Sequence, residues 1–195
     1  MKAASRFQMF CMALVLPIAM WAADGVASRE IDTQKSVMTV RVFKSGLLSA
    51  FGHEHTISAP IRQGTFNERD YAAELAVDAG KMRVMDKDVS EKDRAEIQET
   101  MLGPKVLDAG KFPEIRFRST AVESKAGGHW IVSGELSLHG QSQPIKLEVQ
   151  GENGHYRGRT ELKQRAFGIE PVSVGGGTVK VKDELRVEFE IVAKP

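Results

Sequence analysis

Cysteine is almost missing from this chain of 195 residues, which has one, Cys11. That residue lies in an apolar stretch near the start of the sequence, so the rest of the chain can form neither a disulfide nor a thiol-dependent site. Stability must therefore come from packing, and a chain of this length can bury a substantial core. A basic block is also missing, which removes the electrostatic footprint of nucleic-acid binding.

Enzyme motifs are missing as well. The sequence has no G-x-S-x-G, no H-E-x-x-H and no phosphate-binding glycine loop followed by a helix. The glycine run at residues 175–177 sits between short β-type segments and is interpreted as a loop. We therefore expect a protein that is not an enzyme and needs no cofactor.

An apolar run marks the first 27 residues. Lys2 and Arg6 form a basic head, residues 7–23 are mostly apolar or small, and Gly25-Val26-Ala27 supplies the small residues that a signal peptidase reads. The run is short for a full membrane span. We predict a signal peptide at residues 1–27, one domain at residues 28–195 and a periplasmic location. Cleavage would remove two basic residues and Asp24, leaving 25 basic and 25 acidic residues, a neutral chain.

From residue 37 onward the sequence alternates between apolar and polar residues, as strands do when one face meets a core and the other meets water. Eight strands are predicted, around residues 37–43, 61–66, 73–77, 115–121, 130–138, 145–149, 156–162 and 185–191. Asn153-Gly154 predicts a type I′ hairpin turn. A two-sheet sandwich and a closed barrel both satisfy this pattern, and the hairpin order of the strands favours the barrel.

One helix interrupts the strands. Ser90 is a good N-cap, Asp93 follows three residues later, and Gly103-Pro104 ends the helical pattern. The helix is predicted over residues 90–102, within an insertion that reaches Asp108. Its apolar stripe is narrow, chiefly Ile97 and Met101, so we expect it on a surface or across an opening.

The stretch from Gly46 to His55 joins the first two predicted strands and holds two histidines one residue apart. If the stretch is a strand, His53 and His55 point to the same side. Three interpretations remain open: the pair faces solvent, binds a metal ion or haem, or hydrogen-bonds the polar head of a long apolar ligand. His139 directly follows a strand and is interpreted as a turn residue that bonds backbone groups.

Four short stretches carry a resemblance to a known family: Gly46 to His55, Phe112 to Ser119, Gly134 to Gly140, and Phe167 to Ile169. In this order and spacing, the chain from Ile31 to Ala193 resembles the YceI-like family of secreted, lipocalin-like barrels associated with polyisoprenoid binding. The resemblance implies an all-β fold, an eight-stranded antiparallel lipocalin-like barrel with a helical insertion. It also implies a carrier of a polyisoprenoid lipid or quinone, with transient contact to a membrane surface and a homodimer as further expectations.

Two mouth elements are expected on this interpretation, the stretch Phe51-Gly52-His53 and the helix. A barrel of this size holds either packed side chains or one small ligand, and a filled interior would instead favour a structural interaction protein. The candidate ligand-binding residues are Phe51, His53, His55, Phe66, Phe117, Trp130, Leu136 and Phe189.

Overall fold

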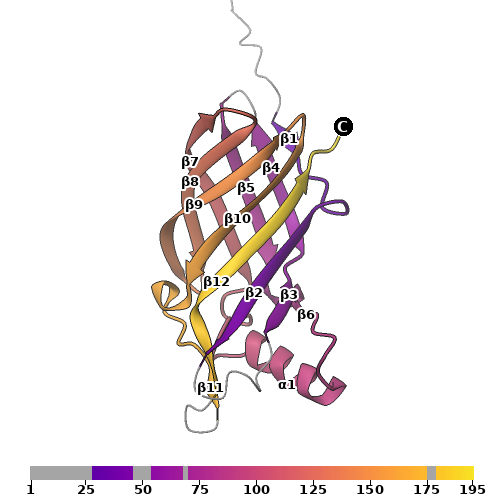
Figure 1. Cartoon of the computed structure of the whole chain (residues 1–195), viewed down its shortest axis with the longest axis vertical. Coiled ribbons are helices and arrows are strands. Elements are labelled where there is room, and N and C mark those ends of the chain that lie inside the picture. Colours follow the sequence, from indigo (N-terminus) through magenta and orange to yellow (C-terminus); the bar gives the residue numbers. More distant parts are fainter. Residues whose placement is uncertain (1–27, 46–53, 68–69, 175–178) are drawn as a thin grey trace, which may run out of the picture.

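The computed structural model describes residues 28–45, 54–67, 70–174 and 179–195, which form a curled, barrel-like antiparallel sheet with one α-helix at one end (Figure 1). The strands are β1 (Arg29–Glu30), β2 (Val37–Ser45), β3 (His55–Ser58), β4 (Ile61–Asn67), β5 (Ala72–Asp78), β6 (Arg83–Val84), β7 (Glu114–Lys125), β8 (His129–Leu138), β9 (Gln141–Glu152), β10 (His155–Lys163), β11 (Ser173–Val174) and β12 (Val179–Val192). The helix α1 spans Glu91–Leu102, and two short 3-10 helices span Ala79–Lys81 and Gln164–Phe167.

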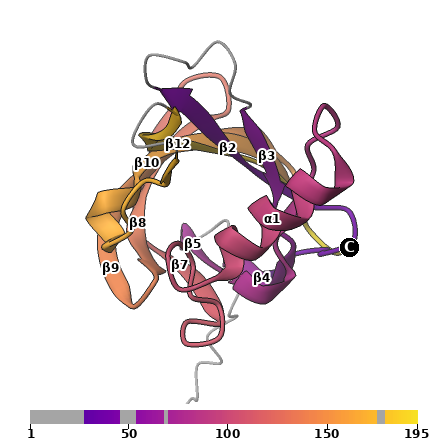
Figure 2. The ribbon, with the colours of Figure 1, turned by 90° about the horizontal axis from the view of Figure 1, so that it is seen from below.

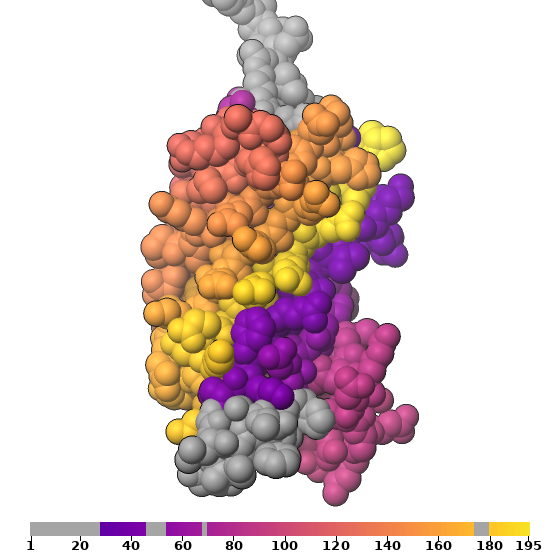
Figure 3. Space-filling view, viewed as in Figure 1, coloured from indigo at the N-terminus to yellow at the C-terminus, as the bar shows by residue number. Residues whose placement is uncertain are grey.

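The strands follow one path in the order β1-β4-β5-β7-β8-β9-β10-β12-β2-β3-β6, with β11 paired to β12. Strong tilt is visible in Figure 3, where the C-terminal strands and β2 run as diagonal bands across one face. Two ends can be distinguished. The hairpin end carries the β7–β8 and β9–β10 turns, and the helix end carries α1 (Figure 1).

Hydrogen bonds join the first described residues to the C-terminal residues at the hairpin end. Ile31 bridges Ala193, the Asp32 N–H donates to the Val192 carbonyl, and the Lys194 N–H donates to the Glu30 carbonyl. The Lys194 ammonium also donates to the Glu30 carboxylate at 2.6 Å. This hydrogen bond and the lysine's charge hold the pKa of Glu30 below its ordinary value.

The predicted count of eight strands is wrong, because the described sheet has twelve. All eight predicted strands are present, as β2, β4, β5, β7, β8, β9, β10 and β12. The four additional strands, β1, β3, β6 and β11, are two to four residues long. Segments this short carry no readable alternation; Pro60, which cannot donate to a ladder, separates β3 from β4.

Local signals for the helix and the turn are confirmed. The Ser90 hydroxyl accepts the N–H of Asp93 at 3.1 Å and caps α1. Gly103 ends the helix, as expected, and its conformation is extended with φ −76°. Asn153 and Gly154 have φ of 54° and 82°, as a type I′ turn requires.

The helix lies across part of its end of the sheet (Figure 2). Gln98 fixes it there, because its side chain accepts the Val84 N–H at 2.8 Å and donates to the Met82 carbonyl at 2.9 Å. Met101 is the one fully buried residue of α1. Beside it, Leu107, Ile169 and Phe167 are buried in the main core cluster, and Phe167 is only 1% exposed. The described part of the helix end therefore holds buried apolar side chains.

Candidate functional site

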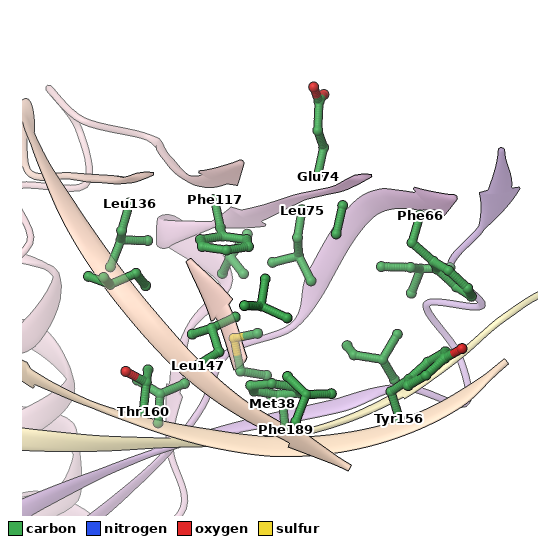
Figure 4. Close-up of a pocket in the computed structure, with 18 of the residues that line it drawn as sticks. Met38, Phe66, Glu74, Leu75, Phe117, Leu136, Leu147, Tyr156, Thr160 and Phe189 are labelled. Atoms are coloured by element: carbon green, nitrogen blue, oxygen red, sulfur yellow. The ribbon is translucent and has the colours of Figure 1, made fainter. Parts of the chain in front are cut away.

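A cavity of about 490 Å³ occupies the interior of the curled sheet. Figure 4 shows apolar side chains from several strands converging on it, among them Met38, Leu75, Phe117, Leu147 and Phe189. These positions share the inward face of the period-2 pattern, while the charged residues between them point outward. The described interior is hollow and apolar, so the alternative of a solidly filled barrel does not apply to it.

Two glycines explain why the interior is open. An added Cβ at Gly134 would lie 2.4 Å from the Phe117 ring, and one at Gly158 would lie 2.5 Å from the Phe189 ring. Each ring therefore packs directly against a glycine of a neighbouring strand, in space that a side chain would otherwise take. Both glycines occupy inward positions of their strands, β8 and β10, between lining residues. We therefore expect these paired aromatic and glycine positions to control the width of the cavity.

Polar groups are rare in the described lining. Thr160 is buried, and its hydroxyl is satisfied because it donates to the Lys146 carbonyl at 2.7 Å. Glu74 is in contact with the cavity but its carboxylate points away from it (Figure 4) and pairs with Arg118 at 2.9 Å. No lysine, arginine or histidine is among the described lining residues. The deep cavity therefore suits a hydrocarbon chain and offers no partner to a charged group.

The lining reaches the surface at the hairpin end. Asn67, Tyr71, Trp130, Glu152 and Asn153 belong to it there. In contrast, no residue of Glu91–Leu102 lines the cavity, so the helix does not form the mouth that we expected. The other predicted mouth element, with Phe51 and His53, lies outside the described residues.

His55 has a different partner from the ones considered above. Its Nδ1 lies 2.7 Å from Oδ2 of Asp86, whose other carboxylate oxygen accepts the Thr56 N–H at 2.7 Å. The Asp86 side chain is only 5% exposed. Arg94 of α1 donates a guanidinium N–H to the Asp86 carbonyl at 2.9 Å. This cluster joins β3, the segment after β6 and the helix. None of its residues belongs to the described lining of the cavity.

Replacing Asp86 with alanine is expected to lower the free energy of unfolding by about 3 kcal/mol. The substitution removes two bonds to a charged acceptor and leaves the half-buried His55 and the Thr56 N–H without their partner. Denaturant unfolding with an unchanged slope would measure this loss. Asp88→Ala, at an exposed position two residues on, is the control, and equal midpoints for the two variants would contradict the structural role of the cluster.

Five of the predicted ligand-binding residues line the cavity: Phe66, Phe117, Trp130, Leu136 and Phe189. Their role in binding stays a prediction. Sequence reasoning did not single out Met38, Leu75, Leu147 or Tyr156, although each stands on the apolar side of an alternating strand. Tyr71 lies in a turn, and no pattern in the sequence marks it as a lining residue.

Metal-type ligands do not gather in the described part of the chain, where no group of three or more His, Cys, Asp or Glu could hold an ion. His139 bonds as a turn residue: its Nδ1 lies 3.2 Å from the Phe167 carbonyl, and its φ is 52°. Of the helices in the described ranges, none has the length and apolar character needed to cross a membrane.

Comparison with known proteins gives a consistent set of likenesses. Residues 30–193 match the model of the family described as YceI-like domain. A UPF0312 protein of Shewanella sp. (strain W3-18-1) is 30% identical over 193 residues, which are 91% of this chain and 92% of the relative. Two solved structures share the fold: BcnA of Burkholderia cenocepacia (TM-score 0.61, 21% identity, 84% of this chain and 99% of that one) and the YCEI protein of Campylobacter jejuni (TM-score 0.52, 13% identity, 71% and 81%).

Proposed function

The chain belongs to the YceI-like family, and from that premise we propose that it binds and carries a long apolar molecule, an isoprenoid lipid or a quinone, without changing it chemically. The observation that carries the proposal is the hollow, apolar cavity of about 490 Å³. Pockets for small molecules typically measure about 300–1,000 Å³ and are mostly apolar with few polar groups. The few polar groups here are Thr160 and the residues of the rim, the part of the lining at the hairpin end that includes Asn67, Glu152 and Asn153.

The size of the cavity bounds the buried part of the ligand. If one methylene group needs about 30 Å³, the share of a water molecule in the liquid, the cavity holds on the order of sixteen such groups. Their burial would contribute about 13 kcal/mol at about 0.8 kcal/mol each. Association and ordering oppose this by some 4–15 kcal/mol, so micromolar binding is attainable and a longer chain must extend out of the mouth.

The predicted signal peptide gives such a carrier a place to work. Exported through residues 1–27, the domain would shield an apolar chain from water between two membranes, where free transfer is slow because each exposed methylene is costly. A periplasmic chain that begins at Ser28, as shown by intact-mass measurement, would support this location. A full-length species held in the membrane would contradict it.

The function is tested by delipidating the purified protein and titrating it with farnesol and a short-chain quinone. We expect saturable binding of at least one of them with one site per chain. Mass spectrometry of an organic extract taken before delipidation is expected to show a co-purifying apolar molecule. A folded protein that binds neither compound saturably would overturn the proposal.

A further inference from the structure

The rim of the cavity holds amide and carboxylate side chains, and its described lining contains no basic residue. On the premise of the proposed function, we infer that the ligand enters at the hairpin end between Tyr71 and Trp130. We infer also that its head group is uncharged, with Glu152 as the residue that excludes anionic heads.

The first step concerns the end through which a ligand passes. At the helix end the lining residues Leu107, Met82 and Ala59 are all buried. At the hairpin end the lining residue Tyr71 is 47% exposed and Trp130 is half-buried. The described lining is therefore buried at the helix end and exposed, at an aromatic pair, at the hairpin end.

The second step concerns the aromatic pair itself. The rings of Tyr71 and Trp130 lie 5.4 Å apart and are tilted by 45°. Trp130 is anchored, because its Nε1 donates to the Gly151 carbonyl at 3.4 Å. Tyr71 has φ 52°, a conformation that is uncommon for a bulky residue and that clusters at ligand sites. Close to Tyr71, the Asn67 side chain bonds both the N–H and the carboxylate of Asp70.

The third step concerns charge at the rim. Glu152 and Asn153 belong to the lining and are exposed, so a head group left at the mouth meets a carboxylate and amides. Two basic residues near this end, Arg29 beside Gly154 and Lys125, have other contacts. Arg29 lies 5.8 Å from the centre of the Phe66 ring and donates to the Lys194 carbonyl, and Lys125 pairs with Glu123. A hydroxyl or quinone oxygen can bond to such a rim, whereas a phosphate would be desolvated beside a like charge.

The test compares farnesol with farnesyl phosphate, which share one chain and differ only in the head. The full chain carrying Trp21→Phe has Trp130 as its single tryptophan, so its emission reports occupation of the mouth directly. At pH 7 we expect farnesol to bind at least tenfold more tightly than farnesyl phosphate. Glu152→Lys is expected to reduce this ratio at least fivefold.

The matched control is Glu96→Lys, a charge reversal at an exposed position of α1 at the other end. It is expected to leave the ratio unchanged, and circular dichroism checks that both variants fold. Equal binding of the two ligands, or tighter binding of the phosphate, overturns the inference while the proposed function stands. A ratio that responds to Glu96→Lys and not to Glu152→Lys places entry at the helix end and overturns it too. If farnesol itself does not bind, the proposed function fails.

Discussion

Leu147→Asp is expected to weaken binding of farnesol on the order of a thousandfold at pH 7 while the protein stays folded. Leu147 projects into the middle of the cavity (Figure 4) and is only partly buried, so in the free protein water can solvate a carboxylate there. An apolar chain that fills the cavity would strip this water away. The carboxylate must then take up a proton, which at pH 7 costs about 4 kcal/mol for a group with an ordinary pKa near 3.9.

The same reasoning fixes the pH dependence of that variant. Because the bound state favours the neutral acid, the pKa of the new carboxyl is raised in the complex, and affinity rises as pH falls from 7 toward about 4. The asparagine of Leu147→Asn has nearly the same shape as the aspartate but cannot titrate. The affinity of this variant for farnesol should therefore not rise as the pH falls. A Leu147→Asp protein whose affinity is independent of pH would show that the ligand leaves the carboxylate in water.

A neighbouring position supplies the control for charge alone. Lys146→Asp introduces the same carboxylate one residue earlier on β9, where the side chain is exposed on the outer face. It is expected to leave farnesol binding within a factor of two of the parent protein. If Lys146→Asp and Leu147→Asp weaken binding equally, the ligand does not occupy the interior, and the proposed function loses its central observation.

How much of this fold can be predicted from the sequence depends on the range of the signal. Residues close together in the sequence determine the long strands, the Ser90 cap and the Asn153-Gly154 turn, so local patterns identify these elements. The strands β1 and β6 are two residues long and form because another part of the chain lies beside them. His55 and Asp86 are 31 residues apart in the sequence, and no pattern near His55 predicts that Asp86 is its partner.

The candidate site shows the same limit. Alternation places Phe117, Leu136 and Phe189 on an inward face, and they do line the cavity. It does not reveal whether facing side chains meet across the interior or leave it open. That depends on Gly134 and Gly158, whose missing side chains accept the rings of Phe117 and Phe189, and the pairing is visible only in three dimensions. The expectation that the helix forms the mouth has a related origin. A narrow apolar stripe indicates that most of a helix is exposed, but it does not indicate which opening, if any, the helix covers.

Gly134→Ala is expected to lower the free energy of unfolding by about 3 kcal/mol, at the upper end for overpacking of a core. The new Cβ would lie 2.4 Å from two atoms of the Phe117 ring and 2.5 Å from the Arg118 carbonyl oxygen. We expect the ring to shift toward the lumen, and the carbonyl belongs to the backbone of the neighbouring strand β7. Denaturant unfolding measures the loss, and farnesol binding should weaken as well because the displaced ring narrows the cavity.

Gly110→Ala is the matched control, because an added Cβ there meets nothing within 4 Å. It should change stability by less than about 0.5 kcal/mol, as surface substitutions usually do. The double variant Gly134→Ala with Phe117→Leu separates the two contacts. Removing the ring relieves the side-chain clash and leaves the one with the Arg118 carbonyl, so part of the lost stability and most of the lost binding should return. Full stability in Gly134→Ala alone would mean that the wall yields at this point and that the glycine does not set the width of the cavity.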